Sequence, residues 1–209
     1  MLEVLLALPF VLALSVAAFH AVPRSAIAWM AAFAPLLGLA ILAWLTPAVM
    51  SGDVPRTVYE WVPQVGLLFD LRLDGLAWMF AGLVLGIGVL VVMYARYYLS
   101  AQDSAPRFFA YLLLFMGSML GMVLAGNLLL MVVFWELTSI SSFLLIGFWA
   151  HQQDARQGAR MALTITAMGG LALLGGVLLI GRVTGSYDLD VVLASGELIA
   201  ASPLYPAIL

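Results

Sequence analysis

LLLMVVFWELTSISSFLLIGFWA, residues 128–150, is long and apolar enough to cross a lipid bilayer as a single helix. Its only ionisable residue is Glu136, three positions from the middle of the stretch, or roughly 4.5 Å along a helix axis. A carboxylate at that depth is costly, so such residues usually face a bundle interior or a water-filled cavity and serve ion or proton pathways. Glu136 is therefore the candidate site. The alternative is a protonated, hydrogen-bonded acid that only joins two helices.

The composition around this stretch indicates a membrane protein throughout. The chain is 65% hydrophobic and 9% charged, with a mean hydropathy of +1.14. Cysteine is absent, which excludes disulfides, thiol redox chemistry and metal–thiolate sites. We find no nucleotide-binding loop, nucleophile constellation or metal-ligand spacing, so we expect no cofactor and no enzyme activity of the chain's own. The first helix lacks a basic leader and a cleavage site, so we expect it to be retained.

The apolar runs predict an all-α polytopic membrane protein that forms a single transmembrane domain over residues 1–209. We place six spanning helices and the start of a seventh. Pro35 lies inside the second helix and should kink it. The predicted helices are 2–22, 25–49, 75–99, 108–125, 128–150 and 161–183, and the seventh begins at 203–209.

The loop between the second and third helices, residues 50–74, has a strand pattern of its own. Residues 69–74 (FDLRLD) alternate strictly, residues 57–62 are rich in β-branched and aromatic side chains, and PQVG at 63–66 has turn chemistry. We predict a β-hairpin on the outer membrane surface, with a second outer loop at 184–202. Asp70 and Asp74 have either a scaffold role or a catalytic one.

The distribution of arginines predicts the orientation. All eight basic residues are arginine, and an outer N-terminus places five of them in the cytoplasm against three outside. The cytoplasmic set is Arg24, Arg96, Arg107, Arg156 and Arg160, and the outer set is Arg56, Arg72 and Arg182. We therefore predict a multi-pass protein of the bacterial inner membrane with its N-terminus outside.

Small residues recur at helical spacing in three of the predicted helices. Gly82 and Gly86 form one GxxxG pair, and Gly117 and Gly121 form another. Such positions let helix backbones approach closely in lipid. The sixth helix carries a similar row at Gly169, Ala172 and Gly176. The pattern predicts a tightly packed bundle.

Three further polar residues are candidates to act with Glu136. Ser139 lies about 60° from Glu136 around the helix, so it is a possible partner of the carboxyl group. Arg160 is either a charge that modulates Glu136 or an anchor that snorkels to the cytoplasmic surface. His151 is either a proton relay near neutral pH or a solvated loop residue.

These residues carry a family resemblance. The runs GMVLAGN (121–127) and FWELTSISSFLLIGFW (134–149) resemble the fifth-helix signature of the large subunit of Mrp-type monovalent cation/proton antiporters. LRLDGL at 71–76, Tyr94 with Tyr97 and Tyr98, and RMALTIT at 160–166 before Gly169 and Gly170 match the helices on either side. The match extends over residues 58–180. The proton-pumping membrane subunits of respiratory complex I resemble the chain more distantly.

The resemblance implies that Glu136 belongs to an intramembrane proton pathway, in which it pairs with a lysine on a broken seventh helix. This chain has no lysine, and the family's large subunit is several times longer. We therefore expect an N-terminal portion of that subunit, completed by the remaining chain or by a split partner that carries the lysine. Membrane lipid and other membrane subunits are the expected partners, and nucleic acid is not. A proton-pumping subunit of complex I or of a membrane-bound hydrogenase, and a non-transporting structural module, remain as alternatives.

Overall fold

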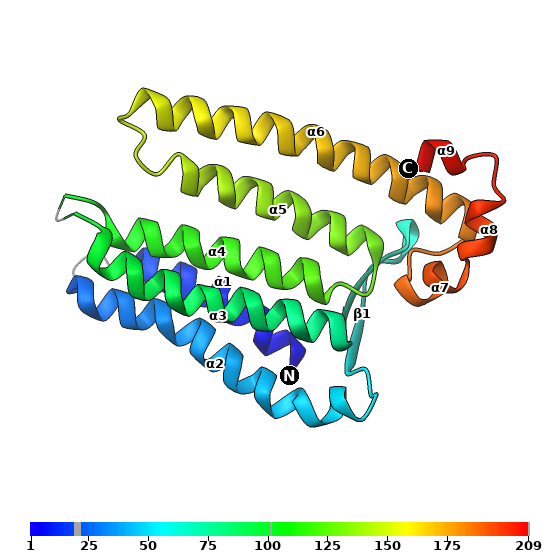
Figure 1. Cartoon of the computed structure of the whole chain (residues 1–209), viewed down its shortest axis with the longest axis horizontal. Helices are drawn as coiled ribbons and strands as arrows, with labels where there is room; N and C mark the ends of the chain where they lie inside the picture. Colours follow the sequence, from blue (N-terminus) through cyan, green and yellow to red (C-terminus); the bar gives the residue numbers. More distant parts are fainter. Residues whose placement is uncertain (19–21, 101, 209) are drawn as a thin grey trace.

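The computed structural model describes residues 1–18, 22–100 and 102–208. Six helices in this part run back and forth with their axes nearly parallel (Figure 1). They are α1 (Leu2–Ala18), α2 (Arg24–Met50), α3 (Gly75–Tyr98), α4 (Ala105–Leu124), α5 (Leu128–Ile146) and α6 (Gln153–Thr184). In the described residues, α2 to α6 are each long and apolar enough to cross a membrane, while α1 is shorter. The chain is a multi-pass membrane protein.

Helix α4 is the centre of the bundle. It contacts α1, α2, α3 and α5, and it buries the largest share of its residues among the five long helices. Helix α6 packs against α5 at one edge of the bundle and leaves most of its surface exposed (Figure 1). The core therefore lies between α1 and α5, and the interface between α5 and α6 is close to the surface of the described chain.

The predicted strands are present. Strand β1 (Arg56–Val62) pairs in antiparallel fashion with β2 (Leu67–Arg72), so that Arg56 lies opposite Arg72. The short 3₁₀ helix η1 (Pro63–Val65) and Gly66, at a left-handed φ of 75°, close the hairpin. The hairpin covers the end of the bundle where α3 and α5 begin and where α2, α4 and α6 end (Figure 1). We call this the hairpin end.

Two predicted helix boundaries near Glu136 are wrong. Helix α5 stops at Ile146 rather than at residue 150, because the next residues form turns that bind the loop before α4 and the first turn of α4. The indole of Trp149 donates to Asp103 at 2.8 Å, and Arg107 donates to the carbonyl of Phe148 at 2.9 Å. Helix α6 begins at Gln153, eight residues earlier than predicted, because its polar first turns are helical outside the apolar run.

The second predicted outer loop, 184–202, contains helical structure that was not predicted. Helices α7 (Leu189–Ala194) and α8 (Gly196–Ala200) lie there, and Asp188 caps α7 by accepting from the backbone N–H groups of Asp190 and Val191. Where the start of a seventh spanning helix was predicted, the structure has the four-residue helix α9 (Tyr205–Ile208), which packs against α6. Residues 19–21 of the first predicted helix and Leu209 lie outside the described residues.

The glycine rows pack differently from the prediction. A Cβ at Gly117 would meet the ring of Phe10, and one at Gly121 would overlap the ring of Phe134. These two glycines therefore accept aromatic side chains from α1 and α5 and do not bring helix backbones together. Gly86 and Gly169 face open space. At α4 the small residues therefore serve ridge-into-groove packing, whereas in α6 a Cβ at Gly176 would lie 3.0 Å from the backbone carbonyl oxygen of Ile208.

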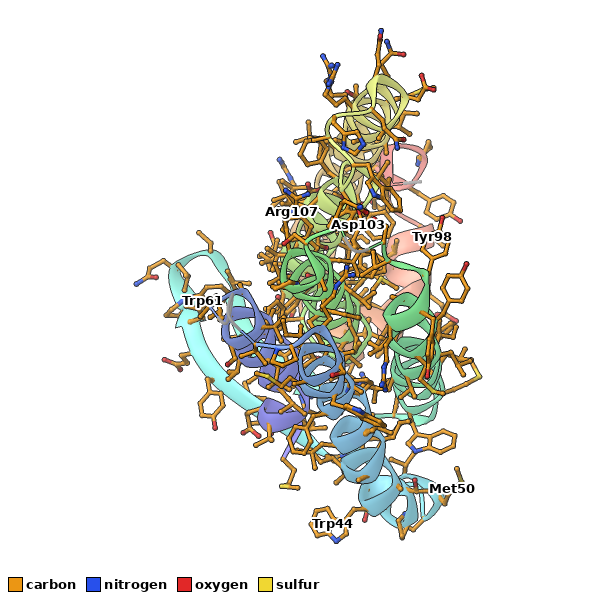
Figure 2. The ribbon with its side chains drawn as sticks, turned by 90° about the vertical axis from the view of Figure 1, so that its left-hand side faces the viewer. Trp44, Met50, Trp61, Tyr98, Asp103 and Arg107 are labelled. Carbon is orange, nitrogen blue, oxygen red and sulfur yellow. The ribbon has the colours of Figure 1, made fainter. Side chains whose placement is uncertain are left out.

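Exposed aromatic residues lie near both ends of the helices, as expected at the two interfaces of a bilayer. Figure 2 shows Trp44 and Met50 at the lower edge of the molecule, Tyr98 at its right-hand side and Trp61 at its left-hand side. At the hairpin end the exposed aromatics include Trp44, Tyr59 and Trp61, and at the other end Trp29, Tyr94, Tyr97 and Tyr98.

Candidate functional site

Glu136 lies next to the midpoint of α5 and faces α6. A Cβ on Gly170 would overlap the Glu136 Oε1 atom, so the missing side chain of Gly170 makes the space that the carboxyl group occupies. Gly170 itself lies near the middle of α6. Glu136 is half-buried, and among the described residues no group donates a hydrogen bond to it. The structure thus places an acid at mid-depth between two helices, and the described residues leave its carboxyl oxygens free to bind a proton or water.

A cavity of about 830 Å³ connects Glu136 with the hairpin end. Leu129, Val132, Val133 and Leu137 line it from α5, and Leu174 and Leu178 from α6. At the hairpin end its lining includes Gln64 and Tyr187. Liquid water occupies about 30 Å³ per molecule, so this space is large enough for several water molecules between Glu136 and the hairpin turn. Most of the wall is aliphatic, and Glu136 is its one titratable group at mid-depth.

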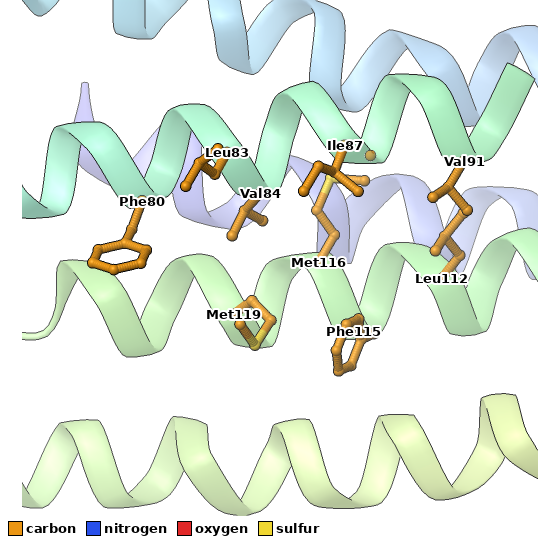
Figure 3. A pocket seen from close by; sticks show the side chains of 10 residues that line it. Phe80, Leu83, Val84, Ile87, Val91, Leu112, Phe115, Met116 and Met119 are labelled. Atoms are coloured by element: carbon orange, nitrogen blue, oxygen red, sulfur yellow. The ribbon is translucent and has the colours of Figure 1, made fainter.

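A second cavity, about 310 Å³ in volume, lies between α3 and α4 (Figure 3). Its lining is apolar and includes Phe80, Ile87 and Met116. Because none of its lining side chains titrates, it offers no group that could bind or release a proton. Of these two cavities, the α5–α6 cavity is therefore the one with a titratable group at mid-depth, Glu136.

Ser139 does not bind Glu136 in the structure. Its buried hydroxyl donates to the carbonyl of Trp135 at 3.2 Å. Ser141 likewise donates to the carbonyl of Leu137, at 2.7 Å, in the manner that hydroxyl side chains commonly adopt in membrane helices. The predicted partnership of Ser139 with the carboxyl group has no contact to support it.

Arg160 and His151 lie at the end opposite the hairpin. Arg160 is exposed, and its Nε donates to the carbonyl of Arg156 at 3.3 Å. It is ten residues from Gly170, or roughly 15 Å along the axis of α6, so it does not contact Glu136. His151 is exposed in the turn between α5 and α6. The structure brings neither residue to the acid.

A charge cluster of six residues fastens the hairpin end. Two of its members, Asp70 and Asp74, stand out in the sequence as candidates for a scaffold or a catalytic role, whereas their pairing with distant residues does not. Asp70 is fully buried and accepts two hydrogen bonds from Arg56, at 2.9 and 2.6 Å. Arg56 also pairs with Asp188 and, at 3.0 Å, with Asp190. The remaining members of the cluster are Arg72, which binds Asp190, and Asp74, which accepts from Arg72. Arg56 thus joins β2 to the segment that follows α6.

These ion pairs shift the pKa values of the groups outside the membrane. The hydrogen bond with Asp70 is the main reason that the pKa of Arg56 is raised. Burial raises the pKa of Asp188, but the hydrogen bond and charge of Arg56, together with hydrogen bonds from the backbone of Asp190 and Val191, outweigh it, so that the pKa is lowered overall. Asp188 is therefore ionised at neutral pH.

Further hydrogen bonds, from the Asn127 side chain and from the backbone, join the hairpin to the start of α5 and to the segment after α6. Asn127 caps α5 through its carbonyl oxygen and donates from its amide nitrogen to Gly66 at 3.0 Å. The N–H of Leu128 donates to Tyr187, and that of Leu189 donates to Gly126, both at 2.8 Å. The hairpin, the start of α5 and the end of α6 therefore form one connected unit above the cavity.

Comparisons with known proteins agree with this geometry. Residues 125–203, which include Glu136 and Gly170, match the family described as NADH:quinone oxidoreductase/Mrp antiporter, transmembrane region. Residues 61–109 match the N-terminus of chain 5 of NADH-ubiquinone oxidoreductase (complex I). The chain belongs to the Mrp antiporter and complex I membrane-subunit family. Glu136 lies in the part of the chain that the first of these matches covers.

Curated relatives in the Mrp group align along nearly the whole chain. A probable K⁺/H⁺ antiporter subunit of the A/B type from Rhizobium meliloti is 54% identical over 209 residues, which are 100% of this chain and 21% of the relative. The A1 subunit of a Na⁺/H⁺ antiporter from Staphylococcus aureus is 39% identical over 206 residues, or 98% of this chain and 26% of the relative. The chain therefore spans about a quarter or less of the length of these Mrp relatives.

Solved structures show the same arrangement of helices. The Mrp complex from Dietzia sp. aligns with a TM-score of 0.80 and 31% identity, over 99% of this chain and 22% of that one. A chain of the membrane-bound sulfane sulfur reductase, an archaeal respiratory membrane complex, aligns with a TM-score of 0.77. Its identity is 22% and its coverage is 96% of this chain and 40% of that one, so this second likeness shows the fold alone.

Proposed function

We propose that the chain is the N-terminal portion of the large subunit of a monovalent cation/proton antiporter, in which Glu136 binds and releases the transported proton. The observation that carries this proposal is an acid at mid-depth that faces Gly170 and a cavity. The names of the Rhizobium and Staphylococcus relatives support the class of transport.

The surroundings of Glu136 suit reversible protonation. An aliphatic wall disfavours the charged carboxylate, whereas a positive charge nearby favours it. Alternation between these two conditions lets one carboxyl group load a proton and then release it. Arg160 is roughly 15 Å away along α6, too far for a direct ion pair. We therefore infer that the positive partner comes from the remaining part of the subunit or from a second chain, and we retain Arg160 only as a long-range modulator.

Transport is measured in everted membrane vesicles that contain the assembled complex. After respiration has acidified the vesicle interior, addition of Na⁺ or K⁺ should release protons from it, and vesicles from a strain without the complex should not respond. Titrating both ions decides the preference, since one relative is named for K⁺ and another for Na⁺. A complex that assembles but responds to neither ion contradicts the proposal.

A second candidate function is that of a membrane subunit in a redox-driven proton pump. The match of residues 61–109 to chain 5 of complex I favours it, and the fold is shared with an archaeal respiratory complex. Purification of the native assembly distinguishes the two functions. Iron–sulfur and flavin subunits in the purified complex would establish the redox pump, whereas membrane subunits alone would establish the antiporter.

We further propose that the hairpin end faces the outside of a bacterial inner membrane. Five arginines lie toward the opposite end, in agreement with the positive-inside rule. Ser51 and Ser104 are exposed at the two ends of this cysteine-free chain. An impermeant thiol reagent applied to intact cells should label Ser51→Cys and leave Ser104→Cys unmodified. Labelling of Ser104→Cys from outside would reverse the orientation.

A further inference from the structure

Tyr187 occupies a notch between the hairpin and the end of α6. A Cβ on Gly181 would overlap its ring, and one on Gly66 would lie 2.9 Å from its Cδ2 atom. Two glycines from separate elements thus leave room for a single aromatic ring. The backbone of Tyr187 is held in place, because its carbonyl accepts from Leu128 and the next residue, Asp188, pairs with Arg56.

The ring separates two cavities. On the inner side lies the cavity that contains Glu136. On the outer side lies a cavity of about 360 Å³, whose polar lining residues are Asn127, Ser186 and Asp188. The two cavities have only Tyr187 and Val65 in common among their lining residues. A path that leads from the outer cavity to Glu136 therefore passes these two side chains.

We propose that this path is the route by which water and hydrated protons reach Glu136 from the hairpin end, with Tyr187 and Val65 as its narrow point. The inference deepens the proposed function and rests on it. Because the backbone around Tyr187 is fixed by the charge cluster, rotation of the ring is the movement that opens the route.

The chemistry of the walls fits a proton better than a metal cation. Ionised Asp188 at the outer cavity attracts positive charge toward the entrance. Beyond the ring, the inner cavity offers polar groups only at Gln64, Glu136 and Tyr187 itself, and the rest of its lining is apolar. A bare cation would lose its hydration shell there without gaining enough oxygen ligands. A proton needs no such ligands from the wall, because it passes from one water molecule to the next along a chain.

Accessibility of a cavity residue to a thiol reagent tests the route directly. Val133 lines the inner cavity beyond the ring, and the natural chain has no cysteine. The reporter Val133→Cys, in the full-length protein and its assembled complex, is exposed to a small, positively charged methanethiosulfonate reagent. Right-side-out and inverted vesicles present the hairpin end and the opposite end to the reagent in turn.

Tyr187→Ala should raise the modification rate of this reporter from the hairpin end about tenfold, which corresponds to a barrier lowered by about 1.4 kcal/mol. Tyr187→Phe keeps the ring and should leave the rate unchanged. Gly181→Ala displaces the ring without removing it and should also raise the rate. Gly175→Ala is its matched control, because a Cβ at Gly175 on the same helix meets nothing within 4 Å.

An unchanged rate in both Tyr187→Ala and Gly181→Ala, or modification from the opposite end alone, would overturn the route. Native gels show whether each variant assembles. If Tyr187→Ala does not assemble, Gly181→Ala still tests the route. Modification does not depend on transport. If the complex exchanges ions but the modification rate does not depend on Tyr187, the route alone is refuted. If the modification rate depends on Tyr187 but the complex does not exchange ions, the proposed function alone is refuted.

Discussion

Replacing Glu136 by glutamine is expected to abolish proton-coupled cation transport while the protein still assembles. The amide keeps the volume and hydrogen-bonding capacity of the acid but cannot bind and release a proton. Because Glu136 is half-buried and no described group donates a hydrogen bond to it, the substitution breaks no observed hydrogen bond. Cation-dependent proton release from everted vesicles measures the effect, and native gels report assembly.

Two further variants sharpen the Glu136 experiment. Glu136→Asp keeps the acid but withdraws it by one methylene group, so partial activity is expected where water in the cavity bridges the gap. Glu197→Gln, at an exposed glutamate of α8, is the matched control and should transport normally. Wild-type exchange by an assembled Glu136→Gln complex would make Glu136 a structural residue and would favour the non-transporting module.

Replacing Gly170 by alanine should slow transport by roughly tenfold to a hundredfold, the effect expected when a reacting group is displaced by about 1 Å. The new methyl group would occupy the position of Glu136 Oε1 and force the carboxyl group to turn toward the cavity. The acid itself remains, so the activity should fall without disappearing. The rate of cation-dependent proton release in everted vesicles is the measurement.

The neighbouring glycine provides the control. A Cβ on Gly169 meets nothing within 4 Å, so Gly169→Ala adds the same methyl group one position away without touching the acid. Equal rates for the two variants would show that the contact between α5 and α6 at Glu136 does not matter for transport. A defect confined to Gly170→Ala would show that the close approach positions the carboxyl group.

The helices could be predicted because each is a long apolar run, but their ends depend on contacts between distant residues. Residues 147–150 are as apolar as a helix interior, yet Trp149 and Phe148 are fixed by Asp103 and Arg107 in turns outside α5. The first turns of α6 are polar, and the sequence predicts a loop there because hydropathy cannot distinguish a polar helix from a polar connection.

The depth of Glu136 was readable from its position within the apolar run, whereas its surroundings were not. Which residue of α6 faces it depends on the rotation of both helices, and Gly169 and Gly170 look equivalent in the sequence. The angle between Glu136 and Ser139 predicts a contact, but the Ser139 hydroxyl donates its hydrogen bond to the carbonyl of Trp135 on the same helix. The pairing of Arg56 with Asp188 joins residues 132 positions apart, which no local pattern reveals.

That separation has a consequence for the order in which the protein is made. The pair between Arg56 and Asp70 can close as soon as the hairpin has been synthesised, because its partners are 14 residues apart. Arg56 meets Asp188 only after α3 to α6 have been synthesised and inserted, so the last ion pair at the hairpin end forms when α6 reaches the correct depth. A chain whose sixth helix is misplaced would therefore lack the ion pair between Arg56 and Asp188, whereas the pair between Arg56 and Asp70 lies within the hairpin and would be retained.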